Sequence, residues 1–207
     1  MTKKKIILLG ATGSVGVQAL DVIAAHPDQF ELVGFAFGKN IEKAREIIQA
    51  FSPKIVVASQ ESSQIELAQE FPSVEIHVGA EGLITLAQLE AYDILLNAIV
   101  GSVGLPPTIE AVKLGRDIAL ANKETLVVAG YTIMAEAART GSKILPVDSE
   151  HAAIFQVLQG VQISDVRSLT ITASGGSFRD QTREELLDVT LDDALAHPNW
   201  TMGAKIT

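Results

Sequence analysis

The chain has 207 residues, of which 47% are hydrophobic and 20% charged, a formal net charge of −9 and no cysteine. The negative charge argues against nucleic acid or an anionic membrane as the main partner, and no run reaches the ~18 uncharged apolar residues of a membrane span. The lack of cysteine excludes disulfides, thiolate zinc sites and cysteine nucleophiles, so a reducing cytoplasm is the simplest location.

A glycine-rich turn follows the first apolar run. Residues 6–9 predict a strand, the segment Gly10-Ala11-Thr12-Gly13-Ser14-Val15-Gly16 a tight turn, and residues 15–23 a helix. Glycines let the backbone approach a pyrophosphate, and the N–H groups at a helix start attract its charge. The spacing GxxGxxG is less specific than GxGxxG, and a turn without ligand is the alternative. Its place directly after a strand favours a dinucleotide site. Since the N-terminus leads straight into this strand, we expect no signal peptide.

The second predicted strand, residues 31–37, ends in Gly38-Lys39-Asn40. An NAD site places Asp or Glu near this point for the ribose hydroxyls. Here no carboxylate repels a 2′-phosphate, and an ammonium and an amide are available to receive it. The segment therefore favours NADP(H), the alternative being a solvated loop lysine.

Strand and helix patterns alternate through about residue 147, which is typical of an α/β, Rossmann-like, doubly wound parallel sheet. Further strands are predicted at 54–58, 75–78, 93–97, 117–120 and 143–147, with helices at 41–51, 66–70, 84–89 and 107–114. After residue 147 we predict a strand at 168–174 and helices at 183–187 and 191–195. The last three residues resemble the start of a strand, so we expect domains at 1–147 and 148–207, the second being the incomplete start of an α+β domain.

Two polar segments follow predicted strands. Asp148-Ser149-Glu150 can turn both carboxylates to one side, because residues i and i+2 of an extended chain point the same way. Hard oxygen ligands suit Mg²⁺ or Mn²⁺. The alternative is a capping segment for a helix at 151–158. Asn122-Lys123-Glu124 can bind a substrate oxygen or a phosphate, or can simply begin a helix.

Two later segments are weaker signals. Residues 173–177, with two glycines, can present backbone N–H groups to an anion or form a plain turn. Residues 197–203 place the only tryptophan, Trp200, between His197 and Gly203. Such a segment suits a lid that excludes water, and a packing anchor is the alternative reading of Trp200.

Together these segments resemble the 1-deoxy-D-xylulose 5-phosphate reductoisomerases. GATGSVG, GKN, LANKE, PVDSEHAAIFQ, TASGGSFRD and HPNWTMGAKIT occur in the family's order and spacing along the whole chain. The resemblance implies an NADPH-dependent enzyme of non-mevalonate isoprenoid biosynthesis, homodimeric at full length. It rearranges a sugar phosphate on Mg²⁺ or Mn²⁺ and then reduces the resulting aldehyde to 2-C-methyl-D-erythritol 4-phosphate.

The resemblance also implies roles for individual residues. Cofactor contacts fall to Thr12, Gly13, Ser14, Val15, Gly38, Lys39, Asn40, Asn122, Glu124 and Gly203. The metal ligands are Asp148 and Glu150, which act in catalysis with Lys123 and His197. Substrate contacts fall to Lys123, Ser149, Glu150, Ser174, His197, Trp200 and Met202.

One departure concerns the family's continuation after KIT, a VDSATMMNKGLE-like segment that supplies phosphate contacts and a third metal carboxylate. It is absent here, so we expect this chain by itself to be an inactive fragment of the enzyme. The alternative is a non-catalytic NADP(H)-binding module. Semialdehyde dehydrogenases fit worse because they use a nucleophilic cysteine, and this chain has none. Short-chain dehydrogenases use a Tyr-x-x-x-Lys motif, and neither Tyr92 nor Tyr131 has a lysine four residues on.

Overall fold

The computed structural model describes residues 2–173 and 175–199. The chain divides into two compact units, Met1–Val157 and Leu158–Thr207. Of the helices in the described part of the chain, none is long and apolar enough to span a bilayer.

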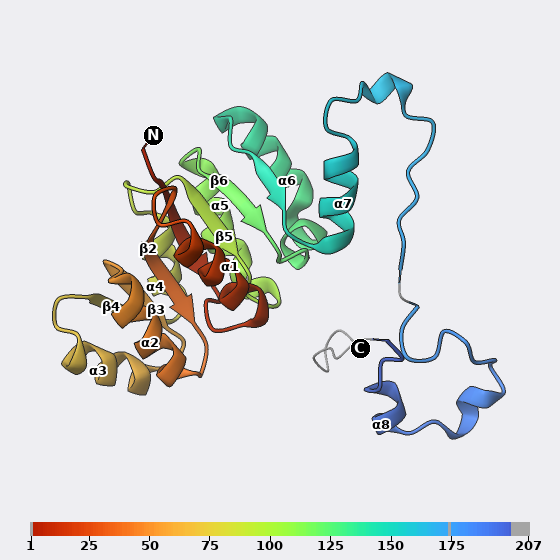
Figure 1. Ribbon diagram of the computed structural model, residues 1–207, viewed down its shortest axis with the longest axis horizontal. Helices are drawn as coiled ribbons and strands as arrows, with labels where there is room; N and C mark the ends of the chain where they lie inside the picture. Colours follow the sequence, from red (N-terminus) through yellow and green to blue (C-terminus); the bar gives the residue numbers. More distant parts are fainter. Residues whose placement is uncertain (1, 174, 200–207) are drawn as a thin grey trace. The chain divides into compact units, whose positions relative to one another are not determined.

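A seven-stranded parallel sheet forms the centre of the first unit (Figure 1). Its strands are β1 (Lys4–Leu9), β2 (Phe30–Phe37), β3 (Ile55–Ala58), β4 (Glu75–Val78), β5 (Ile94–Asn97), β6 (Asp117–Leu120) and β7 (Ile144–Pro146). The order across the sheet is β4-β3-β2-β1-β5-β6-β7. The chain therefore winds outward from β1 in both directions, which confirms the predicted α/β, doubly wound fold and puts its switch point between β1 and β5.

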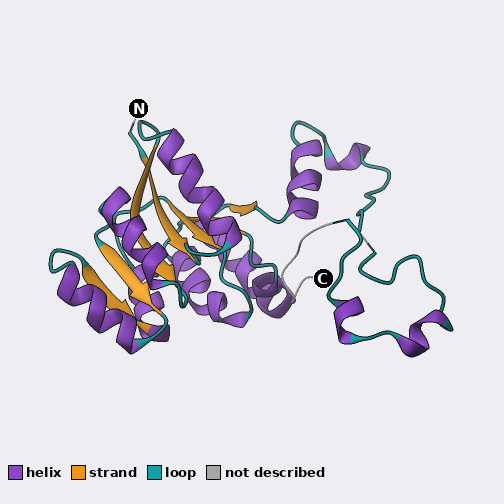
Figure 2. Ribbon diagram, turned by 60° about the horizontal axis from the view of Figure 1, so that its bottom comes forward, coloured by secondary structure: helices purple, strands orange, loops and turns teal. Residues whose placement is uncertain are grey.

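Helices cover both faces of this sheet (Figure 2). One face packs against α1 (Ser14–Ala25), α2 (Ile41–Phe51) and α3 (Glu61–Glu70), and the other against α4 (Gly79–Ala87), α5 (Leu105–Lys113) and α6 (Glu124–Thr140). Successive side chains of a strand point to opposite faces, so Leu8 enters the core under α1 while Ile7 and Leu9 enter the other. Burial on both sides explains why residues 6–9 of β1 are an unbroken apolar run.

Helix starts are where the sequence-based boundaries differ most from the structure. The helices predicted at 66–70 and 84–89 begin earlier, at Glu61 and Gly79. In α3 only Ser63 and Leu67 are buried, so most of the helix carries no apolar periodicity that could mark its start. The helix predicted after Glu150 is α7 (Ser149–Val157), which belongs to the first unit.

Among its described residues, 158–173 and 175–199, the second unit contains only short elements: η2 (Ile163–Asp165), η3 (Glu185–Asp188) and α8 (Leu191–Ala194). Residues 168–173 form no strand, so the strand predicted at 168–174 is wrong over this range. A strand requires hydrogen bonds from a neighbouring strand, and the described residues of this unit offer none. The helix predicted at 183–187 is a 3₁₀ turn, whereas α8 is confirmed and is capped by Thr190 and Asp193.

The expected domain division after Val147 stays a prediction. The first compact unit runs on through α7 and so includes Asp148, Ser149 and Glu150. These residues therefore belong to the same compact unit as the sheet.

Candidate functional site

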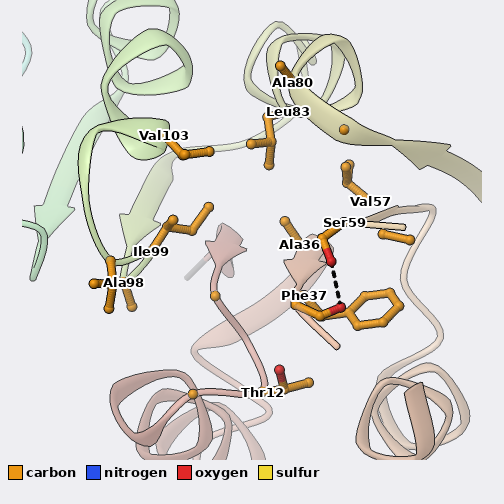
Figure 3. A pocket seen from close by; sticks show the side chains of 16 residues that line it. Thr12, Ala36, Phe37, Val57, Ser59, Ala80, Leu83, Ala98, Ile99 and Val103 are labelled. Carbon is orange, nitrogen blue, oxygen red and sulfur yellow. Dashed lines mark hydrogen bonds between the residues drawn. The ribbon is translucent and has the colours of Figure 1, made fainter. Parts of the chain in front are cut away.

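A pocket of about 420 Å³ opens at the carboxyl ends of β1, β2, β3 and β5 (Figure 3). This is the switch point of the sheet, where open parallel sheets bind their ligands. Its lining consists mostly of small and apolar residues: Gly10, Thr12, Gly13, Ala36, Phe37, Gly38, Val57, Ala58, Ser59, Gly79, Ala80, Leu83, Ala98, Ile99, Val100 and Val103. An apolar pocket with few polar groups is typical of a small-molecule or cofactor site.

The glycine turn forms one side of this pocket. Gly10 has φ +86°, and a Cβ on Gly16 would lie 2.3 Å from the Gly10 carbonyl oxygen, so α1 packs directly on the end of β1. Gly13 is the N-cap of α1, and no described side chain caps the helix at that position. The N–H groups of the first turn, which includes Ser14 and Val15, therefore suit an anion such as a pyrophosphate.

The segment after β2 forms a second side. Gly38 lines the pocket, and a Cβ there would meet no atom within 4 Å, so the missing side chain leaves room for a ligand. The Ser59 hydroxyl donates to the Gly38 carbonyl oxygen at 2.9 Å, the bond drawn in Figure 3. Lys39 is exposed, and Asn40 caps α2 by accepting a hydrogen bond from the Lys43 backbone N–H at 3.0 Å. The Asn40 amide therefore has a structural role that the sequence reading did not include.

The polar residues after β6 have unequal environments. Asn122 is buried and accepts hydrogen bonds from the Thr125 N–H and hydroxyl at 2.9 and 2.8 Å. Lys123 is exposed and reaches across to the end of β7. Glu124 is half-buried at the start of α6. None of these three described residues lines the pocket, so the expected cofactor contacts of Asn122 and Glu124 stay predictions.

Asp148 is the centre of a cluster after β7. Its side chain is 12% exposed, and its carboxylate accepts hydrogen bonds from Lys123 Nζ at 2.7 Å and from His151 Nδ1 at 2.9 Å. Burial opposes ionisation of this carboxyl group, but these bonds outweigh it and lower the pKa of Asp148 to about 2. The bond to Asp148 also raises the pKa of Lys123. Asp148 is thus an anion that two neighbours already hold in place.

The carboxylate of Asp148 also accepts a hydrogen bond from the His151 backbone N–H, as a helix cap does. Glu150 is exposed in the first turn of α7. The structure therefore contains the helix-capping interaction that was the alternative interpretation of this segment. The metal-ligand role of Asp148 and Glu150 stays a prediction. The side chains of residues 2–173 and 175–199 form no group of three or more His, Asp or Glu that could hold a metal ion.

The low pKa of Asp148 predicts a pH-dependent contribution to stability. A carboxyl group whose pKa is depressed in the folded state stabilises it above the ordinary pKa of 3.8, and this stabilisation is lost as the pH falls toward 2. The difference in unfolding free energy between the wild type and Asp148→Asn should therefore shrink between pH 6 and pH 2.5. Chemical denaturation at both pH values measures it; a constant difference would contradict the prediction.

Four expected site residues, Ser174, Trp200, Met202 and Gly203, lie outside the residues that the structure describes. His197 lies in the second unit, where its Nδ1 accepts a hydrogen bond from the Asn199 N–H at 3.1 Å. In the first unit, the structure thus brings Lys123 to the segment that contains Asp148, Ser149 and Glu150. It also places the glycine turn and Gly38 around one pocket.

Sequence reasoning missed a set of residues that line or support the pocket. Ser59 follows β3, and Ala98, Ile99 and Val100 follow β5. The rule that parallel sheets bind ligands at the carboxyl ends of their strands selects these positions once the strands are assigned. His151, which contacts Asp148, lies one helical turn after it and is visible only once the helix start is known.

Comparisons with known proteins assign both parts of the chain to one enzyme family. Residues 6–130 match the family 1-deoxy-D-xylulose 5-phosphate reductoisomerase, and residues 144–207 match the C-terminal domain family of the same name. The 1-deoxy-D-xylulose 5-phosphate reductoisomerase of Bacillus subtilis strain 168 is 56% identical over 206 residues, covering 99% of this chain and 54% of the relative. That of Geobacillus kaustophilus is 55% identical over 205 residues, with the same coverage. The chain spans about half the length of these relatives.

Solved structures show the same fold. A DOX-P reductoisomerase in complex with NADPH, fosmidomycin and magnesium superposes with a TM-score of 0.87 at 35% identity, covering 98% of this chain and 53% of that one. The enzyme from Zymomonas mobilis in complex with NADPH gives a TM-score of 0.87 at 35% identity, covering 94% of this chain and 52% of that one.

Proposed function

Because the chain belongs to the 1-deoxy-D-xylulose 5-phosphate reductoisomerase family, we propose that its full-length protein converts 1-deoxy-D-xylulose 5-phosphate to 2-C-methyl-D-erythritol 4-phosphate with NADPH and Mg²⁺ or Mn²⁺. The observation that carries the proposal is the pocket at the switch point of the sheet. It joins the start of α1 at Gly13, which suits a pyrophosphate, to Gly38, where space is left for a ligand. NADPH, when bound, supplies the hydride.

The cofactor half of this proposal can be tested on the 207-residue chain, because the pocket lies within its first unit. Titration with NADPH, followed by the fluorescence of the reduced nicotinamide, should give saturable binding. NADPH that stays free at high protein concentration would overturn this half.

Cofactor preference is expected to depend on Lys39. Lys39 is exposed and directly follows Gly38, which lines the pocket, and Glu42 in the first turn of α2 is paired with Arg45 at 2.6 Å. A 2′-phosphate therefore meets a cation rather than a free carboxylate. Lys39→Asp should erase or reverse the preference for NADPH over NADH, measured as the ratio of the two Kd values. Equal Kd values for both cofactors in the wild type would contradict the prediction.

For the substrate half, we propose that Asp148 and Glu150 hold the metal and that Lys123 and Ser149 contact the sugar phosphate. The donor set fits the metal, because carboxylate oxygens are the ligands that Mg²⁺ and Mn²⁺ prefer. A divalent metal held by these carboxylates would supply Lewis-acid polarisation of substrate oxygens. Lys123 and His151 fix the orientation of the Asp148 carboxylate by donating hydrogen bonds to it. The Lys123 ammonium is a cation beside this carboxylate and would suit an oxygen of the substrate. By resemblance, we also propose substrate contacts for His197, Ser174, Trp200 and Met202 and a cofactor contact for Gly203.

We further propose that residues 1–207 alone do not turn over substrate. The support is that the described residues form no group of three carboxylate or histidine ligands. The alternative is a non-catalytic NADP(H)-binding module, which the position of the whole pocket in one unit favours. NADPH oxidation with deoxyxylulose phosphate, compared between this chain and its full-length protein, separates the two. Turnover only at full length supports the enzyme, and none in either supports the module.

The remaining proposals concern the setting of the enzyme. We place it in the cytoplasm because the chain has no cysteine, and we expect no contact with nucleic acid or membrane because its net charge is −9. A homodimer at full length follows from the resemblance alone.

A further inference from the structure

One wall of the pocket is a loop rather than a strand end or a helix. Residues 98–104, named here the pocket loop, connect β5 to α5 and include the short helix η1 (Ser102–Gly104). Four of its residues, Ala98, Ile99, Val100 and Val103, line the pocket, and Figure 3 shows three of them labelled on one side of it. The loop contains Gly101 at φ +83°. Without support from outside, such a segment samples many conformations.

The first support comes from Asn97, at the end of β5. Its side chain is fully buried, and its amide nitrogen donates to the Gly104 carbonyl oxygen at 3.0 Å and to the Thr108 hydroxyl at 2.9 Å. Its amide oxygen accepts a hydrogen bond from the Ile99 N–H at 3.2 Å. Thr108 in turn donates to the Gly104 carbonyl oxygen at 2.7 Å. Asn97 therefore ties the beginning of the pocket loop to its end.

The second support comes from Asn122, on the neighbouring strand connection. Its side-chain nitrogen donates to the Ile99 carbonyl oxygen and, at 2.7 Å, to the Gly101 carbonyl oxygen. Its backbone N–H donates to the Asn97 carbonyl oxygen at 3.1 Å. Asn122 thus holds the middle of the loop, while Thr125 fixes the amide oxygen of Asn122 by donating two hydrogen bonds to it.

Both amide groups are fully used inside the protein. A primary amide offers two N–H donors and one oxygen, and in Asn97 and Asn122 each of these has a hydrogen-bond partner. Both residues are at most 2% exposed, and neither lines the pocket. A direct hydrogen bond from either side chain to a ligand would break a buried pairing, which is costly.

We propose that Asn97 and Asn122 are positioning residues that hold the pocket loop in the shape that receives the cofactor. This inference rests on the proposed binding of NADPH in the pocket. The two amides order the loop before the ligand arrives, so that the ligand does not have to order it. Cofactor affinity therefore depends on two buried residues that need not touch the cofactor.

The test measures NADPH affinity and loop protection in variants of the 207-residue chain. Asn97→Ala and Asn122→Ala should each raise the Kd for NADPH about tenfold or more, because the loop must then be ordered on binding. In the absence of cofactor, hydrogen exchange at the pocket loop should become faster in both variants. The matched control is Tyr92→Phe, which removes one buried hydrogen bond, from the Tyr92 hydroxyl to the Ala87 carbonyl oxygen at 2.7 Å, away from the loop.

The control should leave the Kd within about twofold and the loop protection unchanged. If Asn97→Ala does not fold, Thr108→Val tests the same cluster, because it removes the hydroxyl shared by Asn97 and Gly104. The inference is overturned if the variants keep the wild-type Kd, or if only Asn122→Ala weakens binding while loop exchange stays unchanged, which would indicate a direct contact. A wild type that binds no NADPH would instead overturn the proposed function, and the exchange data would still decide whether the asparagines hold the loop.

Discussion

Replacing Gly16 with alanine is expected to abolish measurable NADPH binding. The added Cβ would lie 2.3 Å from the Gly10 carbonyl oxygen and 2.7 Å from the Ala11 backbone, and all of these contacts are to backbone that cannot rotate away. The start of α1 must therefore move off the end of β1. That shift displaces the first-turn N–H groups that the pyrophosphate would meet. Overpacking of this kind also destabilises a fold by about 1–3 kcal/mol.

The matched control for this variant is Gly130→Ala in α6. A Cβ there would meet its nearest atom, in Leu126, at 3.8 Å, which is ordinary contact distance. Gly130 follows a kink at Ala129 and is not among the glycines with positive φ, so alanine should fit there, with stability within about 1 kcal/mol of the wild type and NADPH affinity unchanged. Fluorescence titration measures the Kd, and denaturant unfolding shows that the protein tested is folded. Wild-type affinity in Gly16→Ala would refute the assignment of the turn as the pyrophosphate site.

The sheet and its switch point were predictable because their signals are local. The apolar residues 6–9 of β1 and the glycine turn after them lie within a dozen residues of sequence, and burial on both faces favours apolar residues at successive positions of a strand. The contact between Lys123 and Asp148 could also have been predicted from the sequence. Both follow strands that are neighbours in the sheet, since Leu120 of β6 is in register with Pro146 of β7.

The pocket loop could not be predicted in the same way. Asn122 donates to carbonyl groups that lie more than twenty residues earlier in the chain, and nothing in the local sequence distinguishes it from a helix cap or a ligand contact. The strand prediction at 168–173 was wrong for a related reason. Whether an apolar segment becomes a strand depends on a neighbouring strand that can be far away in the sequence. The role of a residue whose hydrogen-bond partners are backbone groups far away in the sequence becomes apparent only in the folded structure.

Replacing Glu150 with glutamine in the full-length protein is expected to remove metal-dependent turnover. Glutamine keeps the size of the side chain but loses the negative charge that a divalent cation requires of its ligand. Glu150 is exposed in the first turn of α7, so the fold should tolerate the change. Even partners of metal ligands cost about 10–100-fold in affinity or activity when removed, so loss of a ligand itself should lower kcat by more than about 100-fold.

This experiment also decides between the two roles that the structure leaves open for the segment after β7. A carboxylate that only supports the start of α7 contributes about 0.3–1 kcal/mol to stability and leaves turnover intact. Glu136→Gln is the control: it removes one charge from α6, where Glu136 pairs with Arg139, and should leave kcat within about twofold. NADPH affinity should stay unchanged in both variants, because neither residue lines the pocket. If Glu150→Gln keeps more than a tenth of the wild-type kcat at saturating Mn²⁺, Glu150 is a helix-start residue and the metal ligands must be sought elsewhere.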